Sequence, residues 1–222
     1  MSDNEITLTI DGKSVTVPKG TKVVDAAKQV NVDIPVFCYH EKIGPLGCCR
    51  MCLVEVEKMP KLMTACTMDV MPDMVVKTTT DKVEKAQKGV LEFTLLNHPL
   101  DCPVCDKGGE CPLQDNTFKY GPPDTRMEFH RHNNAKATPL SPVITIDRER
   151  CIACQRCTAY SERIEQDRGL VMLNRGFHNE VGTFNNEPYD TRFSGNVIDI
   201  CPVGALTNTD FRFKARTWDL SN

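Results

Sequence analysis

The sequence predicts an α+β fold built from small segments in series, and three observations support this prediction. Apolar and polar residues alternate in two short N-terminal runs joined by Asp11-Gly12, a pattern typical of a β-hairpin. Apolar residues recur at helical spacing over residues 81–97. The 12 cysteines gather in separate clusters, and a length of 222 residues allows one large domain or two to three small ones.

The composition excludes several classes of protein. A net charge of −3 gives no positive field to attract nucleic acid. No stretch approaches the roughly 18 apolar residues of a membrane span. The polar, acidic start of the chain, Met-Ser-Asp-Asn-Glu, lacks the features of a secretory signal, so we expect a reducing, cytoplasm-like compartment. Clustered cysteines in such a compartment are typical of metal ligands rather than disulfides.

Residues 1–78 predict a small sheet with one helix. Alternation on either side of Asp11-Gly12 places the hairpin at 6–17. Thr21 is a candidate N-cap for a short helix whose apolar residues lie on one side. Two further apolar runs, Leu53 to Val56 and Met74 to Lys77, predict strands.

The rest of the chain alternates cysteine loops with short regular elements. A helix over 81–97 has a predicted apolar face of Val83, Ala86, Val90 and Phe93, and Pro99 prevents its continuation. Residues 98–120 predict a cysteine loop, and the proline-rich stretch 121–142 predicts a linker. A strand over 143–146 is followed by a third cysteine loop and a helix from about residue 157.

The first ligand set is typical of a [2Fe–2S] centre, which takes four thiolates, three of them from one loop. The glycines of this loop allow backbone N–H groups to turn toward sulfur. Cys48 is surplus because only its neighbour gives the two-residue spacing, so we expect Cys48 to be a small buried residue. A zinc site remains the alternative. The predicted ligands are Cys38, Cys49, Cys52 and Cys66.

The second set has the pattern H-x3-C-x2-C-x5-C. His98 admits two interpretations, a residue at the end of the preceding helix or a metal ligand. Three cysteines supply three of the four ligands of a [4Fe–4S] cluster and no spare cysteine lies nearby, which favours His98 as the fourth. A neutral imidazole in place of a thiolate should raise the reduction potential. The predicted ligands are His98, Cys102, Cys105 and Cys111.

The third set begins with C-x2-C-x2-C, a triple typical of a [4Fe–4S] cluster. The Cys-Pro that would follow closely in a two-cluster ferredoxin appears only at Cys201-Pro202. The predicted ligands are therefore Cys151, Cys154, Cys157 and Cys201. Eleven cysteines and one histidine then supply three complete sets, and only Cys48 is left over.

These sets complete the predicted architecture. We expect a β-grasp [2Fe–2S] ferredoxin domain over 1–78. Over 79–120 we expect a helix and a loop in which one histidine and three cysteines bind a [4Fe–4S] cluster. After the linker at 121–142, we expect a bacterial-ferredoxin-like domain with one [4Fe–4S] cluster over 143–222. No G-x-G-x-x-G or Walker A sequence occurs, so neither a nucleotide nor a flavin site is expected, and no catalytic grouping stands out.

The motifs resemble those of a known family, the N-terminal region of the large iron–sulfur subunit of respiratory NADH:quinone oxidoreductase (complex I). As an ordered set they span nearly the whole chain. The motifs are Phe37-Cys38-Tyr39-His40, Gly47-Cys48-Cys49-Arg50-Met51-Cys52, His98-Pro99-Leu100-Asp101-Cys102-Pro103-Val104-Cys105, Gly108-Gly109-Glu110-Cys111, Cys201-Pro202-Val203-Gly204-Ala205-Leu206 and the tail Phe211-Arg212-Phe213-Lys214-Ala215-Arg216.

The resemblance implies one [2Fe–2S] and two [4Fe–4S] clusters in an electron-transfer subunit of a respiratory complex. Electrons would arrive from the flavin of an NADH-binding partner subunit and leave through a further iron–sulfur subunit toward quinone. The subunit would be cytoplasmic and peripheral, on the inner face of the membrane, with no membrane span and no nucleic-acid partner.

Two departures from the family accompany the resemblance. The family usually has a small residue other than cysteine at the position of Cys48. Its members usually continue into a large molybdopterin-enzyme-like domain, whereas this sequence ends at Asn222, so either it is a short form or that role lies elsewhere. The alternatives are the diaphorase small subunit of an NAD-reducing hydrogenase and, from another class, a zinc-stapled scaffold.

Further residues carry weaker expectations. His40 is close to a predicted ligand, and we expect it to be a loop residue whose hydrogen bond supports the site. His130 and His132 should face solvent. The alternating cations Arg212, Lys214 and Arg216 predict either a strand with one packed face or an interface edge.

Overall fold

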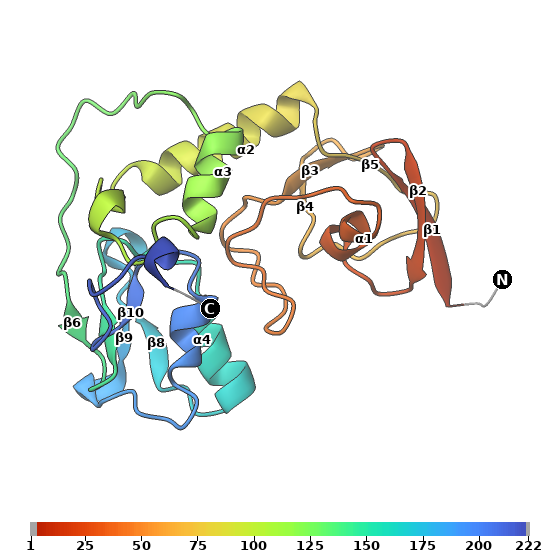
Figure 1. Ribbon diagram of the computed structural model, residues 1–222. Helices are drawn as coiled ribbons and strands as arrows, with labels where there is room; N and C mark the ends of the chain where they lie inside the picture. Colours follow the sequence, from red (N-terminus) through yellow and green to blue (C-terminus); the bar gives the residue numbers. More distant parts are fainter. Residues whose placement is uncertain (1–3, 221–222) are drawn as a thin grey trace.

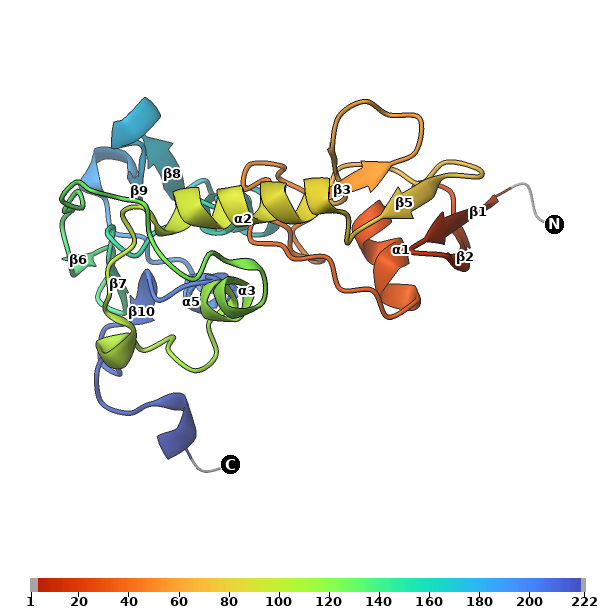
Figure 2. The same cartoon turned by 90° about the horizontal axis from the view of Figure 1, so that it is seen from above.

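The computed structural model describes residues 4–220, arranged as an N-terminal sheet and a C-terminal cysteine-rich half joined by one long helix (Figure 1). Seen from above, the long helix α2, Asp81–Leu95, runs from the sheet to the C-terminal half (Figure 2). Among the described residues, no helix has the length and apolar character needed to cross a membrane.

The N-terminal sheet has the strand order β2-β1-β5-β3-β4. β1 and β2 form the predicted antiparallel hairpin, with Asp11 and Gly12 at positive φ of 47° and 79° in its turn. β5 pairs parallel to β1 and antiparallel to β3, so it lies at the centre of the sheet. The strands are β1 (Glu5–Ile10), β2 (Lys13–Pro18), β3 (Leu53–Val56), β4 (Met63–Thr64) and β5 (Val75–Lys77).

Helix α1, Val23–Gln29, packs its apolar side into the core of this sheet. The prediction that Thr21 caps the helix is wrong, because Lys22 occupies the N-cap position. The Thr21 hydroxyl instead donates to the Pro18 carbonyl at 2.7 Å, which ties the helix entry to the end of β2.

Helix α2 begins at the predicted place. Thr80 is its N-cap, and its hydroxyl accepts a bond from the Val83 amide. The predicted apolar face is correct in part, since Val83 is buried and Val90 packs against the core, but Phe93 is 82% exposed and the other buried residues are Gln87 and Leu91. The buried residues recur at every fourth position, and the Gln87 side-chain amide donates to the Leu53 carbonyl of β3. Phe93, two positions beyond Leu91, falls on the opposite side of the helix.

Residues 98–120 hold a helix where only a loop was expected. Helix α3, Pro112–Tyr120, follows the short 3₁₀ turn Cys102–Val104 and begins with proline at its first position. Proline has no N–H to lose there and its φ suits a helix, so the residue that suggested a loop in fact starts the helix.

The C-terminal half is built on a small sheet with the order β10-β7-β6. The predicted strand at 143–146 is confirmed as β7, and the predicted helix near residue 157 begins one residue earlier and continues as a π turn. The strands and helices of this half are β6 (Thr138–Pro139), β7 (Ile144–Ile146), α4 (Arg156–Tyr160), the π turn Ser161–Glu165, β8 (Leu170–Leu173), β9 (Glu180–Thr183), α5 (Asn196–Ile200) and β10 (Leu206–Asn208). Short 3₁₀ turns complete it, at Gly176–His178, Phe184–Asn186 and Thr217–Asp219.

The stretch 121–142 is mostly irregular and crosses from α3 to the far side of the small sheet (Figure 1). His130 and His132 lie in this stretch and both are exposed, as predicted, with the His132 ring 4.7 Å from that of Phe177. β6 pairs with β7, so the end of this stretch belongs to the sheet.

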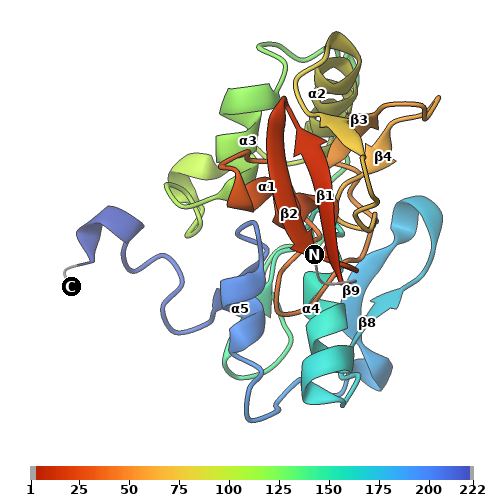
Figure 3. The ribbon, with the colours of Figure 1, turned by 90° about the vertical axis from the view of Figure 1, so that its right-hand side faces the viewer.

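Of the two interpretations of the alternating segment around Arg212, the strand with one packed face is not formed. β10 ends at Asn208, and residues 209–214 form turns. Asn208 stops the strand by accepting amide bonds from Asp210 and Phe211 through its side-chain oxygen. The last described residues, up to 220, project from the body of the molecule (Figure 3).

Candidate metal centres

The first set gathers in the loop between α1 and β3 and just after β4. Cys38, Cys52 and Cys66 are at most 1% exposed. The Cys38 sulfur lies within hydrogen-bonding reach of the sulfurs of Cys48, Cys49 and Cys66, which lowers the pKa of Cys38, and the Cys66 sulfur likewise lies near that of Cys52, whose pKa also falls. The structure therefore brings the four predicted residues together, with Cys48 beside them.

Cys48 and Cys49 both reach Cys38, but they sit in different environments. The Cys49 sulfur accepts from two backbone amides, of Cys38 at 3.4 Å and Met51 at 3.5 Å. The Cys48 thiol donates to the Cys154 carbonyl at 3.2 Å, and the residue is exposed, which corrects the expectation of a buried one. Backbone N–H groups directed at sulfur stabilise a thiolate, so the surroundings of Cys49 suit a ligand better.

His40 belongs to the loop, as predicted. Its carbonyl accepts from the Gly44 amide at 2.7 Å, and its Nδ1 accepts from the Lys42 amide at 3.3 Å. Its ring therefore supports the turn at 40–44, which Gly44 makes possible with a φ of 88°.

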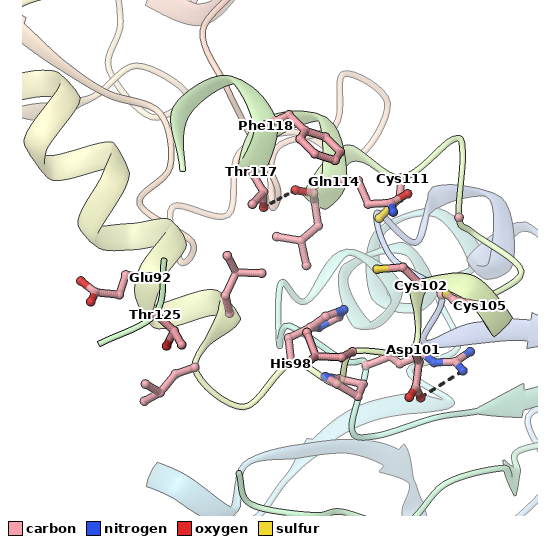
Figure 4. Close-up of a pocket in the computed structure, with 18 of the residues that line it drawn as sticks. Glu92, His98, Asp101, Cys102, Cys105, Cys111, Gln114, Thr117, Phe118 and Thr125 are labelled. Carbon is pink, nitrogen blue, oxygen red and sulfur yellow. Dashed lines mark hydrogen bonds and ion pairs between the residues drawn. The ribbon is translucent and has the colours of Figure 1, made fainter. Parts of the chain in front are cut away.

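The second set lines one cavity of about 410 Å³. His98, Cys102, Cys105 and Cys111 surround this cavity from three elements (Figure 4). The histidine follows α2, two cysteines lie on or beside the 3₁₀ turn, and Cys111 is the N-cap of α3. One imidazole and three thiols around an open cavity are typical of a [4Fe–4S] site, whereas the same residues in a packed core would leave no cavity.

The pKa of His98 falls to about 4, mainly because the ring is buried and also because Arg150 and Arg131 lie near it. The imidazole is therefore neutral at neutral pH and keeps a nitrogen lone pair for a metal.

Gly204 contacts this cavity from the C-terminal half. A Cβ at this position would lie 2.2 Å from the Cys105 sulfur. Only glycine allows the chain after Pro202 to pass this thiol, so the second and third sets are packed directly against each other.

The third set lines a smaller cavity on the other side of the same chain segment. Cys151, Cys154, Cys157 and Cys201 all face this cavity. Burial raises the pKa of Cys151 to about 11 and raises those of Cys154 and Cys157 further. Buried thiolates without compensating positive charge are costly, and iron supplies that charge when a cluster is bound.

The three sets lie in a row with the third in the middle. The Cys48 thiol and the Arg156 guanidinium, which donates to the Tyr39 carbonyl at 2.6 Å, join the first loop to the third. The Cys111 thiol donates to the Pro202 carbonyl at 3.7 Å and joins the second set to the third. This order, first to third to second, differs from the order in sequence.

Three arginines on the cavity walls were not predicted from the sequence: Arg131, which lines the second cavity, and two that directly precede predicted ligands. Arg150 lines the second cavity and Arg156 the third. Arg150 directly precedes Cys151 and Arg156 directly precedes Cys157, and this adjacency was the one signal that could have found these two.

None of the 12 cysteines, all within residues 4–220, forms a disulfide. Across the same residues, no three His, Cys, Asp or Glu side chains converge closely enough to hold a single metal ion. A zinc ion binds its ligands at about 2.0 to 2.3 Å, whereas the ligands of a cluster bind different iron atoms and are spread more widely.

Comparison with sequence families assigns each segment. Residues 3–81 match a 2Fe-2S iron-sulfur cluster binding domain, and residues 87–126 match an NADH-ubiquinone oxidoreductase-G iron-sulfur binding region. Residues 141–207 match the ferredoxin-like domain of NADH-quinone oxidoreductase subunit 3. The fold and the cysteine loops thus define an iron–sulfur protein of ferredoxin type, with a 2Fe-2S domain followed by 4Fe-4S domains.

The relatives are subunits of one enzyme. The chain is 49% identical over 217 residues to the G subunit of NADH-quinone oxidoreductase from Streptomyces coelicolor, and this match covers 97% of this chain and 26% of the relative. It is 46% identical over 219 residues to the mitochondrial NADH-ubiquinone oxidoreductase 78 kDa subunit of Neurospora crassa, covering 97% of this chain and 29% of the relative. The chain belongs to this family of complex I iron–sulfur subunits, and it spans between about a quarter and a third of the length of these relatives.

A solved structure has the same fold. A chain of an NAD+-reducing [NiFe]-hydrogenase in the H2-reduced state superposes with a TM-score of 0.78 at 27% identity, covering 95% of this chain and 90% of that chain. The arrangement therefore occurs both in the family of complex I and in a hydrogenase.

Proposed function

We propose that the chain is an electron-relay subunit of an NADH:quinone oxidoreductase. One [2Fe–2S] cluster would be held by Cys38, Cys49, Cys52 and Cys66, one [4Fe–4S] cluster by His98, Cys102, Cys105 and Cys111, and a second [4Fe–4S] cluster by Cys151, Cys154, Cys157 and Cys201. The observation that carries the proposal is the contiguity of the three sets, since a relay requires neighbouring centres.

The clusters supply the one-electron chemistry, and the residues of the chain control its setting. Thiolates and one neutral imidazole fix the charge at each site, backbone amides donate to sulfur, and buried apolar residues limit water. No residue needs to transfer a proton for such a relay.

The proposed partners follow from the family. A flavin- and NADH-binding subunit would deliver electrons, and a further iron–sulfur subunit would accept them on the way to quinone. The proposed location is cytoplasmic and peripheral, on the inner face of the membrane.

Metal content and spectroscopy test the proposal. The chain, purified anaerobically, should contain about ten irons and ten sulfides, from one [2Fe–2S] and two [4Fe–4S] clusters, and should give their EPR signals on reduction. About three zinc ions and no sulfide would instead indicate the zinc-stapled scaffold. Oxidation of NADH by the isolated chain would also contradict a pure relay.

The hydrogenase-like structure supports a second candidate, the diaphorase small subunit of an NAD-reducing hydrogenase. Its ligand sets would be the same and only the terminal enzyme would differ. The identity of 49% to a complex I subunit, against 27% to the hydrogenase chain, favours complex I. The partner that copurifies with the native chain distinguishes the two.

A further inference from the structure

Arg150 stands out on the wall of the His98 cavity. The residue is 2% exposed, and its Nη1 and Nε have no hydrogen-bond partner within the described residues. Leaving two donors of a guanidinium without hydrogen bonds and out of contact with water is costly, so the place of Arg150 beside a cavity needs an explanation.

The acidic neighbours of Arg150 engage the guanidinium on one side. Its Nη2 lies 3.2 Å from an oxygen of Asp101 and its Nε lies 3.5 Å from an oxygen of Asp147. Asp101 also pairs with Lys136 at 2.5 Å, and Asp147 lies 3.8 Å from Arg212. Each carboxylate is thus shared with another cation, and Nη1 is left for a partner inside the cavity.

The other cations near the cavity are already engaged with backbone. Arg131 donates to the carbonyls of Leu95 and His98, and Arg216 donates to the Cys102 carbonyl at 3.0 Å. Arg216 also has an Nε without a partner but does not line this cavity, so Arg150 is the buried cation on this wall, within residues 4–220, that has donors to spare.

A cluster with three thiolates and a neutral imidazole would carry about −1 when oxidised and about −2 when reduced. A buried positive charge that donates toward sulfur favours the more negative, reduced form. The inference rests on the proposed function for the identity of the group in the cavity.

We propose that Arg150 is a positioning residue for the [4Fe–4S] cluster of the His98 set, donating from Nη1 toward the cluster and raising its reduction potential. The Asp101 and Asp147 carboxylates hold the guanidinium at this wall. Arg150 directly precedes Cys151, so its backbone adjoins the third set, while its side chain lines the cavity of the second set.

The test is a redox titration of the full chain monitored by EPR. Arg150→Gln should make reduction of the His98-set cluster at least tenfold less favourable, a fall of 59 mV for a one-electron couple. Arg150→Lys keeps a charge but loses the planar fork, and should give a shift of intermediate size. The signal of this cluster is assigned beforehand with His98→Cys, which keeps four ligands and should lower its potential.

Arg212→Gln is the matched control. It removes a cation from Asp147 but does not line the cavity, so the shift should be less than a third of that in Arg150→Gln. A wild-type potential in Arg150→Gln, or an equal shift in Arg212→Gln, would overturn the inference.

Two further results decide the remaining cases. If Arg150→Gln fails to assemble the cluster, the Arg150→Lys variant decides: a shift of threefold or more supports the inference and an unchanged potential overturns it. If the wild-type chain contains no [4Fe–4S] cluster, the proposed function itself fails, and iron and sulfide analysis shows this before any variant is made.

Discussion

Cys48 and Cys49 are adjacent in sequence, yet their contacts differ in a way that favours Cys49 as the proposed ligand. Cys49 receives two backbone N–H groups, whereas Cys48 gives its proton to a carbonyl of the third cysteine loop. A sulfur that donates is a thiol, and iron binds the thiolate. The side chain of Cys48 therefore connects two loops.

Replacing Cys48 by alanine should leave the [2Fe–2S] EPR signal in place. The matched replacement Cys49→Ala should abolish it, because a site held by three thiolates and no fourth ligand loses its cluster. EPR spectra of the two dithionite-reduced variants provide the measurement. Loss of the signal in Cys48→Ala with retention in Cys49→Ala would reverse the ligand assignment.

Gly204 is a second residue whose identity matters for one site. A methyl group there would overlap the Cys105 sulfur, so Gly204→Ala should displace this thiol and remove the His98-set cluster, with the loss of about four irons per chain. Gly195→Ala is the control, since no atom lies within 4 Å of its added Cβ. Iron analysis and EPR check the result. Full iron content in Gly204→Ala would show that the thiol has no role there.

At the scale of elements, the loop that carries Cys49 is held by cations from the π turn and from α4. Arg163 donates to the Ile43 carbonyl at 2.9 Å, and Arg156 donates to carbonyls of Tyr39 and Ile200. In Figure 1 this loop extends from the N-terminal sheet toward α4. Bonds from a charged donor to backbone carbonyls thus fix the distance between the first and third sets.

Arg163→Gln should loosen this loop without unfolding the chain. A hydrogen bond to a charged group contributes about 1.5 to 3 kcal/mol, so local opening at residues 43–47 should increase roughly tenfold or more. Hydrogen exchange of these amides measures the opening. Arg168→Gln is the control, because that side chain is 74% exposed and pairs only with Glu162 among the described residues. Equal exchange in both variants would argue against the role of Arg163.

At the scale of the whole molecule, the two halves differ in how they are stabilised. The N-terminal core is mainly aliphatic, with Leu8, Ile10, Val23 and Val76 at most 1% exposed. The C-terminal core includes Cys111, Cys157 and Cys201 and borders the cavity of the second set, whereas Cys52 and Cys66 lie within the otherwise aliphatic N-terminal core. The proposed clusters would therefore contribute more to the stability of the second half than to that of the first.

Removing iron should destabilise the two halves unequally. After chelation under reducing conditions, amides of residues 98–120 and 144–208 should lose most of their exchange protection, because their core retains an unfilled cavity and costly buried thiols. Amides of β1, β2 and β5 should remain protected. Hydrogen exchange with mass spectrometry gives both values in one sample. Loss of protection in the N-terminal strands to the same degree would contradict this division.

The sequence by itself predicted which cysteines and which histidine the structure brings together, and it predicted several elements that local pattern controls. Cysteines separated by two residues necessarily lie close together. The Asp11-Gly12 turn and the start of α2 depend on neighbours within a few residues. Each of these features could therefore be predicted. Only the tertiary structure decided which face of α2 is buried, how Pro112 is used, and that the third set lies between the other two. It also decided that Arg150 faces the His98 cavity. These features depend on contacts between residues far apart in the chain, whose packing no local spacing specifies.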